Sequence, residues 1–373
     1  MKKEKYLKYI FILFPIIILM IISFLNMQNA KLISTQYTNH FTRQIIWYAV
    51  GFGIIGIFLL INPSLLFKYS LFLYAINVIL LILVLFIGKE INGARAWFNF
   101  GFFSYQPSET MKFTLLLYLI HLSSKFQKIP TFKNELKLIS IILLATFIPS
   151  FLTFLEPDTG AVIIYLIIAL IILLLSHIRK RWFIILFLIT TILLGAFFAF
   201  FYFQKDAFIN IFGTSFFYRI DRLIDFKNGS GMQLENALTA IGVSKTFGNG
   251  INNFTLYFPE APTDFIFALT LTNFGFTGGL IVLITCFALN INLLIIVFKN
   301  KNEKIRQISL VIFAILAFQQ LQNILMNIGL SPIIGIPLPF LSYGGTNLIV
   351  LFCLIALLIK MLIIKEKYPL RVL

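Results

Sequence analysis

The sequence predicts an all-α polytopic integral membrane protein, and two features lead to that class. Of the 373 residues, 60% are hydrophobic and 12% are charged, with a mean hydropathy of +0.95. A soluble domain carries about a quarter charged residues. The apolar stretches recur along the chain without the alternation of outer-membrane strands, so we expect helices, whose backbone groups are satisfied internally in lipid.

About ten transmembrane helices are predicted if roughly 20 apolar residues make one crossing. They cover residues 8–26, 45–62, 69–88, 107–124, 137–155, 160–178, 182–202, 276–298, 307–328 and 345–364. The first follows the basic start MKKEKYLK, but no A-x-A-like cleavage site follows it, so we interpret it as a retained span. The prediction is one transmembrane domain over residues 1–373, with a large extracytoplasmic loop, 203–263, between spans seven and eight.

The distribution of charge predicts the orientation. Six segments assigned to the cytoplasm hold 20 Lys or Arg and 4 Asp or Glu, which leaves ten basic and ten acidic residues for the rest of the chain. These segments are residues 1–8, 63–70, 125–137, 177–181, 299–306 and the tail from Lys360. The net charge of +16 therefore lies on one side, which follows the positive-inside rule and places both termini in the cytoplasm. Cations spread over short loops do not favour nucleic-acid binding.

Metal-binding and disulfide frameworks are not indicated. Cys286 and Cys353 both fall inside predicted spans, and His40, His121 and His177 are scattered. Catalysis would depend on carboxylates, basic groups and hydroxyls.

Function is expected at the outer face, where four connections are not ordinary turns: residues 89–111, 154–160, 203–263 and 329–347. Loops longer than about 15 residues are usually functional or disordered. Within the longest, SFFYRIDRLIDF has helix-like apolar spacing and predicts an amphipathic helix on the membrane surface. A plain tether is the alternative.

The stretch QPSETMKF contains a possible ion pair. Pro107 is suited to a first helical turn. Glu109 and Lys112 are three residues apart, hence on one helical face. Ionisable residues at the edge of a span tend to face a cavity or partner. The alternative is a helix start with a snorkelling lysine.

The stretch FLEPDTGA places Glu156 and Asp158 on either side of a proline. Asp158 can be explained as the cap of the next helix. A cap does not require Glu156 as well, and two acids at a membrane edge can hold a divalent cation or position a substrate hydroxyl.

In SPIIGIPLPFLSYGGTNL, three prolines and three glycines predict an irregular backbone. Ser342, Tyr343, Gly344 and Gly345 are expected to offer backbone donors of the kind that bind anions. Irregular backbone at membrane depth is tolerated where it is buried in protein or lines a cavity.

In PEAPTDFIFALTLTNFG, Asp264 stands before a long apolar run. The alternatives are a helix N-cap and a catalytic carboxylate. Residues 264–298 would form a helix on the order of 50 Å long, too long for one untilted span. We expect a break at Asn273, Gly275, Gly278 or Gly279.

Together these motifs resemble one family. GARAWFNFG with QPSETMKF, EPDTGA, PEAPTDFIFAL and GIPLPFLSYGGTNL occur in the order and at the separations of the SEDS family (shape, elongation, division and sporulation), the RodA/FtsW peptidoglycan glycosyltransferases. The match extends nearly end to end, from Arg43-Gln44 and Trp47 to the last span. The resemblance implies ten spans in the bacterial cytoplasmic membrane, with lipid II, a disaccharide-pentapeptide on a polyprenyl pyrophosphate, as substrate.

The resemblance also implies site residues. Asp264 matches the family's essential aspartate and would be the general base for the acceptor hydroxyl. Other characteristic positions are Arg95, Glu109, Lys112, Asp158, Gln233 and Ser342-Tyr343-Gly344-Gly345. Arg95, Lys112 and Arg222 are candidates to stabilise the pyrophosphate, with Mg²⁺ or another divalent cation as a further candidate and no organic cofactor. Besides membrane lipids, the implied partner is a class B penicillin-binding protein transpeptidase.

The chain departs from the family pattern at several positions. Asn236, Ala237, Ser244 and Lys245 follow Gln233 where relatives have a Gln-Ser pair and a Gly-rich turn, Thr272-Asn273 replaces an acidic pair, and Glu156 replaces a glutamine. Two other function classes stay open: a flippase or transporter of lipid-linked precursors, and a non-catalytic paralogue or scaffold that activates a partner. Charges at mid-bilayer depth would favour the transporter.

Overall fold

The computed structural model describes residues 2–91, 93–126, 131–224, 231–251, 253 and 257–367. It is almost entirely helical, as predicted. The helices are α1 (Lys2–Ile33), η1 (Thr35–Tyr37), α2 (His40–Leu60), α3 (Pro63–Lys68), α4 (Ser70–Ile87), α5 (Pro107–Phe126), α6 (Phe132–Leu155), α7 (Thr159–Leu174), α8 (Lys180–Phe203), α9 (Lys205–Phe212), α10 (Thr214–Ile224), α11 (Gly231–Val243), α12 (Ile266–Lys299), α13 (Glu303–Asn327) and α14 (Gly345–Lys367).

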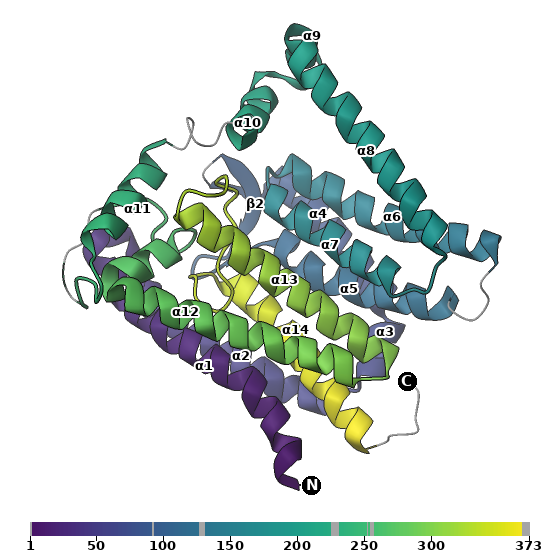
Figure 1. Ribbon diagram of the computed structural model, residues 1–373, viewed down its shortest axis with the longest axis horizontal. Coiled ribbons are helices and arrows are strands. Elements are labelled where there is room, and N and C mark those ends of the chain that lie inside the picture. Colours follow the sequence, from purple (N-terminus) through teal and green to yellow (C-terminus); the bar gives the residue numbers. More distant parts are fainter. Residues whose placement is uncertain are drawn as a thin grey trace.

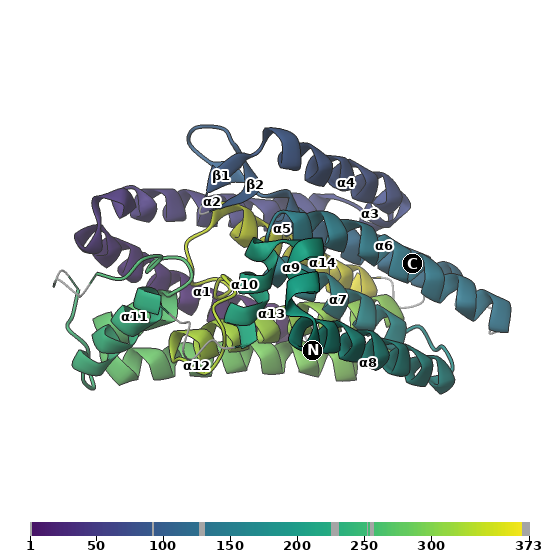
Figure 2. The same ribbon diagram turned by 90° about the horizontal axis from the view of Figure 1, so that it is seen from above.

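Each of the ten predicted spans overlaps one of these helices. Within the described ranges, eight helices are long and apolar enough to cross a membrane; α7 is shorter, and α5 is outside this set. The class of polytopic membrane protein is therefore confirmed, whereas the number of crossings stays a prediction. The start of α1 and the end of α14 lie towards one end of the bundle, and β2 and α11 lie towards the other (Figure 1). Figure 2 shows α2 and α4 along one face and α12 along the opposite face.

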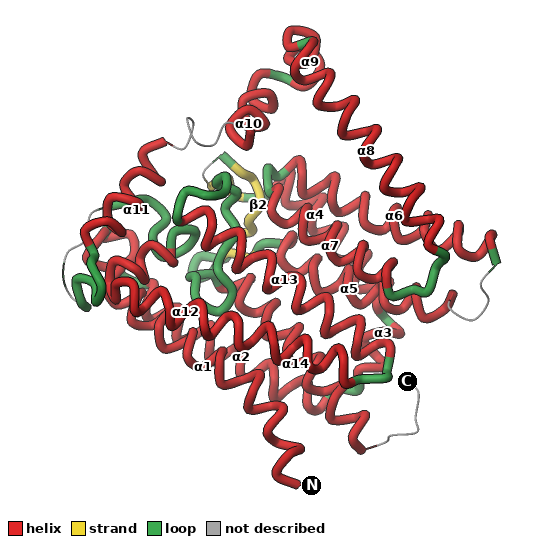
Figure 3. The backbone as a smooth tube through the Cα atoms, in the orientation of Figure 1, coloured by secondary structure: helices red, strands yellow, loops and turns green. Residues whose placement is uncertain are grey.

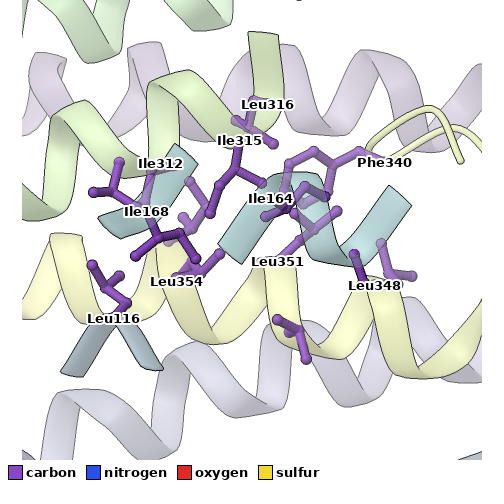
Figure 4. Close-up of a cluster of buried hydrophobic side chains, with 14 of the residues drawn as sticks. Leu116, Ile164, Ile168, Ile312, Ile315, Leu316, Phe340, Leu348, Leu351 and Leu354 are labelled. Carbon is purple, nitrogen blue, oxygen red and sulfur yellow. The ribbon is translucent and has the colours of Figure 1, made fainter. Parts of the chain in front are cut away.

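The centre of the bundle is formed where α5, α7, α13 and α14 meet. Figure 4 shows apolar side chains that fill this contact, and the labelled ones are each at most 2% exposed. The labelled side chains are Leu116, Ile164, Ile168, Ile312, Ile315, Leu316, Phe340, Leu348, Leu351 and Leu354. In lipid, close packing of such side chains, rather than exclusion of water, holds helices together. Phe340 belongs to the irregular 329–344 segment, so this core also anchors that loop.

A small antiparallel sheet, which was not predicted from the sequence, lies at the end of the bundle that the charge distribution predicts to face outwards (Figure 1). It has the order β1-β2-β3, formed by Lys89–Ile91, Ala94–Asn99 and Ser104–Tyr105. Thr346 connects β3 to α14, since its Oγ1 donates to the Ser104 carbonyl at 3.1 Å and accepts from Gln106 N at 3.3 Å. Loop backbone gathers next to the strands at this end (Figure 3).

The expected break in the helix after Asp264 is found at Gly275, whose φ of 65° and ψ of −162° are not helical. The other three candidates for the break do not depart from helical geometry. Loop residues 245–250 pack against the kink: Asn249 N donates to Thr272 O at 2.9 Å, and Gly250 N to Asn273 O at 3.0 Å. A side chain at Gly275 would lie 2.3 Å from Thr246 O, so only glycine permits this approach.

The helix α8 is fixed at its ends and not along its middle. At one end, Trp182 Nε1 donates to Glu135 Oε2 at 2.9 Å. At the other, Phe201, Phe208 and Phe217 form a buried cluster with α9 and α10. No residue of the apolar middle of α8 is buried, and Figure 1 shows this helix leaning away from the bundle. The predicted helix in SFFYRIDRLIDF is confirmed as far as Ile224, where α10 ends, and the last two residues of the motif lie outside the described part of the chain; its position on a membrane surface stays a prediction.

Candidate functional site at the outer end of the bundle

Asp264 lies in a turn, residues 259–265, that the 329–344 loop holds in place. Tyr343 N donates to Pro262 O at 2.8 Å. The Ser342 hydroxyl donates to Thr263 O at 2.7 Å and accepts from Leu338 N at 2.8 Å. Two segments some eighty residues apart in the sequence therefore form one rigid unit.

Two asparagines of α13, which the sequence analysis missed, fix the backbone of Asp264. Asn323 Nδ2 and Asn327 Nδ2 donate to the Asp264 carbonyl at 2.8 and 2.9 Å. Asn323 also donates to Ile336 O at 2.8 Å, and Asn327 Oδ1 accepts from Ala268 N at 2.8 Å. These bonds hold the backbone of Asp264 and do not involve its side chain.

The Asp264 carboxylate does not cap α12, so the cap interpretation is wrong. The N-cap residue of that helix is Phe265, whose side chain makes no capping hydrogen bond, and the first-turn amide of Ala268 donates to Asn327 instead. Within the described part of the chain, no hydrogen bond or ion pair to this partly buried carboxylate is found. Gly335 approaches it closely: with φ at +73°, an added Cβ there would lie 3.4 Å from Asp264 Oδ2.

The pKa of Asp264 is raised to about 7. Burial is the main cause, followed by the negative charges of Glu260 and Asp158. A carboxyl group with a pKa near the working pH is suited to accept a proton during a reaction. Strongly shifted pKa values gather at functional sites because catalysis requires them.

Asp158 has the capping role foreseen for it and a second role. Its Oδ1 accepts from Ala161 N at 3.0 Å, which caps α7. Its Oδ2 accepts from Ser108 Oγ at 2.9 Å and from Gln106 Nε2 at 3.0 Å. Asp158 therefore joins the starts of α5 and α7, and both of its oxygens are occupied.

The buried carboxyl group of Glu156 has no such role. Glu156 is 0% exposed, and neither of its side-chain oxygens has a hydrogen-bond partner. Burial, and next the charge of Asp158, raise the pKa of Glu156 to about 9. The group is therefore protonated and neutral at pH 7.

A divalent cation at these acids stays a prediction from the sequence. Among the described residues, no three His, Cys, Asp or Glu side chains come together as a metal site. We assign no step of the chemistry to a metal.

The substitution Glu156→Gln tests whether the buried Glu156 carboxyl group is neutral. The folded-state pKa is raised above the unfolded value of about 4.3, so the stability that Glu156 contributes is present at low pH and is lost progressively as pH rises towards about 9. We expect Glu156→Gln, which carries no proton to lose, to gain thermal stability relative to the wild type between pH 6 and 9. Thermal unfolding in one detergent measures this, with exposed Glu235→Gln as the control. A constant difference across that range would contradict the assignment.

The predicted contact between Glu109 and Lys112 is confirmed. Lys112 Nζ lies 2.6 Å from Glu109 Oε1, and the two side chains are 3% and 8% exposed. The Tyr165 hydroxyl of α7 donates to Ser108 O at 2.6 Å, which packs the start of α5 against α7. The snorkelling alternative is wrong, because the ammonium group of Lys112 does not reach solvent. For the same reason Lys112 does not fit its expected place as a direct ligand of a pyrophosphate.

Two other candidate residues, Arg95 and Gln233, lie outside this buried cluster. Arg95 is exposed on β2, where Arg95 Nη2 lies 3.6 Å from Glu90 Oε2. Gln233 is exposed on α11. Arg222 belongs to α10, but its side chain lies outside the part of the chain that the structure describes. The structure therefore places Arg95 and Gln233 on the outer surface and does not join them to the acids.

In the Ser342–Gly345 turn, two of the four backbone donors that the sequence predicted to be open are occupied. Ser342 N donates to Leu338 O at 3.0 Å and Tyr343 N to Pro262 O, so both are occupied within the protein. At Gly345 an added Cβ would lie 2.5 Å from the Trp47 ring. This segment supports the Asp264 turn instead of binding an anion through those two amides.

These features define a polytopic membrane protein with a preorganised acid site at one end of its helix bundle. The model of the FtsW/RodA/SpoVE family of cell cycle proteins matches residues 4–367. The chain therefore belongs to that family.

The chain is also similar to named proteins over most of their length. The chain is 32% identical to the probable peptidoglycan glycosyltransferase FtsW of Wigglesworthia glossinidia brevipalpis, over 96% of this chain and 92% of that protein. It is 29% identical to stage V sporulation protein E of Bacillus subtilis, with 85% of each chain covered.

Solved structures show the same fold. A chain from a peptidoglycan synthase complex that coordinates polymerization and crosslinking superposes with a TM-score of 0.74 at 23% identity, covering 94% of this chain and 96% of that one. The crystal structure of RodA from Thermus thermophilus gives a TM-score of 0.67 at 22% identity, covering 96% and 97%.

Proposed function

We propose that this protein is a peptidoglycan glycosyltransferase that polymerises lipid II into glycan strands at the outer face of the cytoplasmic membrane, with Asp264 as the general base. The observation that carries the proposal is the Asp264 carboxylate. It stands on a rigid turn, has no partner among the described residues, and has a pKa of about 7. Membership of the family and the names of the relatives support the substrate class.

The proposed reaction is a glycosyl transfer in which Asp264 accepts a proton. The oxygen of the acceptor's 4-hydroxyl attacks the anomeric carbon of the donor sugar, the bond from that carbon to the pyrophosphate breaks, and the hydroxyl proton passes to Asp264. The hydrogen bonds from Asn323 and Asn327 fix the base in one position, which general acid–base catalysis requires.

The leaving pyrophosphate needs positive charge nearby. Arg95 is the described candidate, since its side chain is half exposed on the same end of the molecule. Arg222 stays a second candidate from the sequence.

A transporter or a scaffold is less well supported than an enzyme. The buried Glu109–Lys112 pair lies in the first turns of α5, beside the start of α7, and not at mid-helix where a transport pathway would place its charges. A scaffold would not require a partner-free carboxylate with a pKa raised to about 7.

Purified protein incubated with lipid II tests the proposal directly. We expect glycan polymer on a gel, and the polymer should disappear on digestion with a muramidase. A folded, monodisperse preparation that leaves lipid II unchanged, alone and with its transpeptidase, would overturn the proposal.

We further propose a class B penicillin-binding protein as partner, because a glycan strand must be crosslinked to become cell wall. A structural neighbour of this chain belongs to a complex that couples polymerization with crosslinking. The exposed apolar faces of α8, together with α9 and α10, offer a surface for a single-span partner. Co-purification under crosslinking should recover such a protein, and its consistent absence would contradict the partnership.

The pH dependence of polymerisation should report Asp264. Because the base works deprotonated, kcat/KM should rise with pH up to about 7 and then level off. Glu260→Gln removes a charge that raises the pKa of Asp264, so the acidic limb should move to lower pH. Glu235→Gln, which removes an exposed charge from α11, is the matched control. If the acidic limbs of Glu260→Gln, Glu235→Gln and the wild type coincide, the effect of the Glu260 charge on Asp264 is contradicted.

A further inference from the structure

A second site lies at the opposite end of the bundle, where α3, α5 and α13 enclose a pocket of about 400 Å³. Its lining consists of Ser64, Phe67, Lys68, His121, Lys125 and Lys304. The three lysines come from three different helices and from three of the segments that the charge distribution assigns to the cytoplasm. The pocket is therefore remote from Asp264.

The lysines of this pocket carry no counter-charge among the described side chains. Lys68, Lys125 and Lys304 form no ion pair or side-chain hydrogen bond there. Two acids of this end have described side chains, and both are used elsewhere. Glu135 pairs with Arg179 at 3.0 Å, and Glu303 lies 3.0 Å from His177 Nε2. Three ammonium groups around one cavity repel each other unless an anion enters.

Phe67, an apolar residue of the pocket lining, lies beside one of these charges. The Lys304 ammonium lies 5.2 Å from the centroid of the Phe67 ring, and Phe67 itself is 5% exposed. A cation over an aromatic face is attracted by the ring, which fixes its position without neutralising its charge. Lys304 therefore points its charge into the pocket and keeps it available for a ligand.

We propose that this pocket binds the phosphate group of an anionic lipid headgroup from the cytoplasmic leaflet. Lysine ammonium groups bind phosphate oxygens as point charges. Basic pockets between membrane helices on the cytoplasmic side are suited to such headgroups.

A lipid fits the surroundings better than a free phosphate ion. Leu65 and Tyr69 are neighbours in the sequence of the lining residues Ser64 and Lys68, Leu71 follows at the start of α4, and the three are 49%, 51% and 56% exposed. Apolar side chains exposed next to a phosphate site can contact acyl chains, for which a soluble anion has no equivalent.

Binding of phosphatidylglycerol to the full-length protein in nanodiscs tests the site. We expect the triple variant Lys68→Gln, Lys125→Gln, Lys304→Gln to bind phosphatidylglycerol at least tenfold more weakly than the wild type. The control triple variant, Lys133→Gln, Lys137→Gln, Lys180→Gln, removes the same charge from exposed positions at this end and should bind as the wild type does. Equal losses in the two variants would overturn the site.

Two further measurements distinguish a lipid phosphate from a free phosphate ion and a lost binding site from a folding defect. Inorganic phosphate should not displace phosphatidylglycerol, and phosphatidylcholine should not replace it; saturation by inorganic phosphate alone would overturn the lipid assignment. Replacing the three lysines by arginine keeps the charge and should keep the binding, and its loss in that folded variant would count against a phosphate site. Because the readout is lipid binding, these outcomes are independent of glycan synthesis.

Discussion

Asp264→Asn should lower glycan polymerisation by about 10²- to 10⁴-fold while leaving expression and folding near normal. Asparagine keeps the volume of the side chain but does not accept a proton as a carboxylate does. The structure supplies the reason that folding should survive: the hydrogen bonds at this residue are made by its backbone carbonyl, with Asn323 and Asn327, and not by its carboxylate. The change therefore removes the base without disturbing the turn.

Polymerisation of lipid II by purified variants, together with thermal unfolding, measures both parts of this prediction. Asp206→Asn on α9 is a suitable control, because it makes the same chemical change at an exposed aspartate in the 203–263 loop. Near wild-type glycan synthesis by Asp264→Asn would rule out the catalytic assignment.

The sequence was informative where a short-range rule decides the structure. Apolar length alone located the long helices, because a backbone in lipid has few alternatives to a helix. The spacing of Glu109 and Lys112 predicted their contact, since residues three apart meet on a helix surface. Asp158 was identified as a cap from its place after a proline and before an apolar run.

The sequence was less informative where segments distant in the chain meet. Asn323 and Asn327 hold Asp264 from about sixty residues away, and their only signal in the sequence is a spacing of four, which places both on one face of α13. The Ser342-Tyr343 amides were predicted to bind an anion, but Tyr343 N is taken by the Pro262 carbonyl, which no local pattern indicates. The short strands were missed because their pairing depends on a turn and not on a long alternating pattern.

The burial of a charge is also a tertiary property. Lys112 was expected both to pair with Glu109 and to stabilise a pyrophosphate, and the structure is compatible only with the first role. At 3% exposure and 2.6 Å from a carboxylate, its ammonium group is already neutralised within the protein. Spacing on a helix predicts which residues can meet, but not which neighbouring helices will cover them.

Single substitutions in the buried Glu109–Lys112 pair should be strongly destabilising, and the double substitution much less so. Removing one partner of a buried pair leaves an uncompensated charge, at a cost of about 3–5 kcal/mol. Glu109→Gln and Lys112→Met should therefore each lower thermal stability and impair polymerisation, because the pair lies one turn from the Asp158 contacts that join α5 to α7. Replacing both groups leaves no buried charge, which is often nearly neutral for stability.

A double-mutant cycle on unfolding free energy, with polymerisation measured in parallel, tests this coupling. The exposed pair of His177 and Glu303 provides the contrast: at 66% and 46% side-chain exposure, solvent screens the charges. Glu303→Gln should thus change stability by at most about 1 kcal/mol. If Glu109→Gln and Lys112→Met instead combine additively, the two residues do not act as a pair, and the stability of the α5 start must depend on its other contacts, chiefly Asp158 with Ser108 and Gln106.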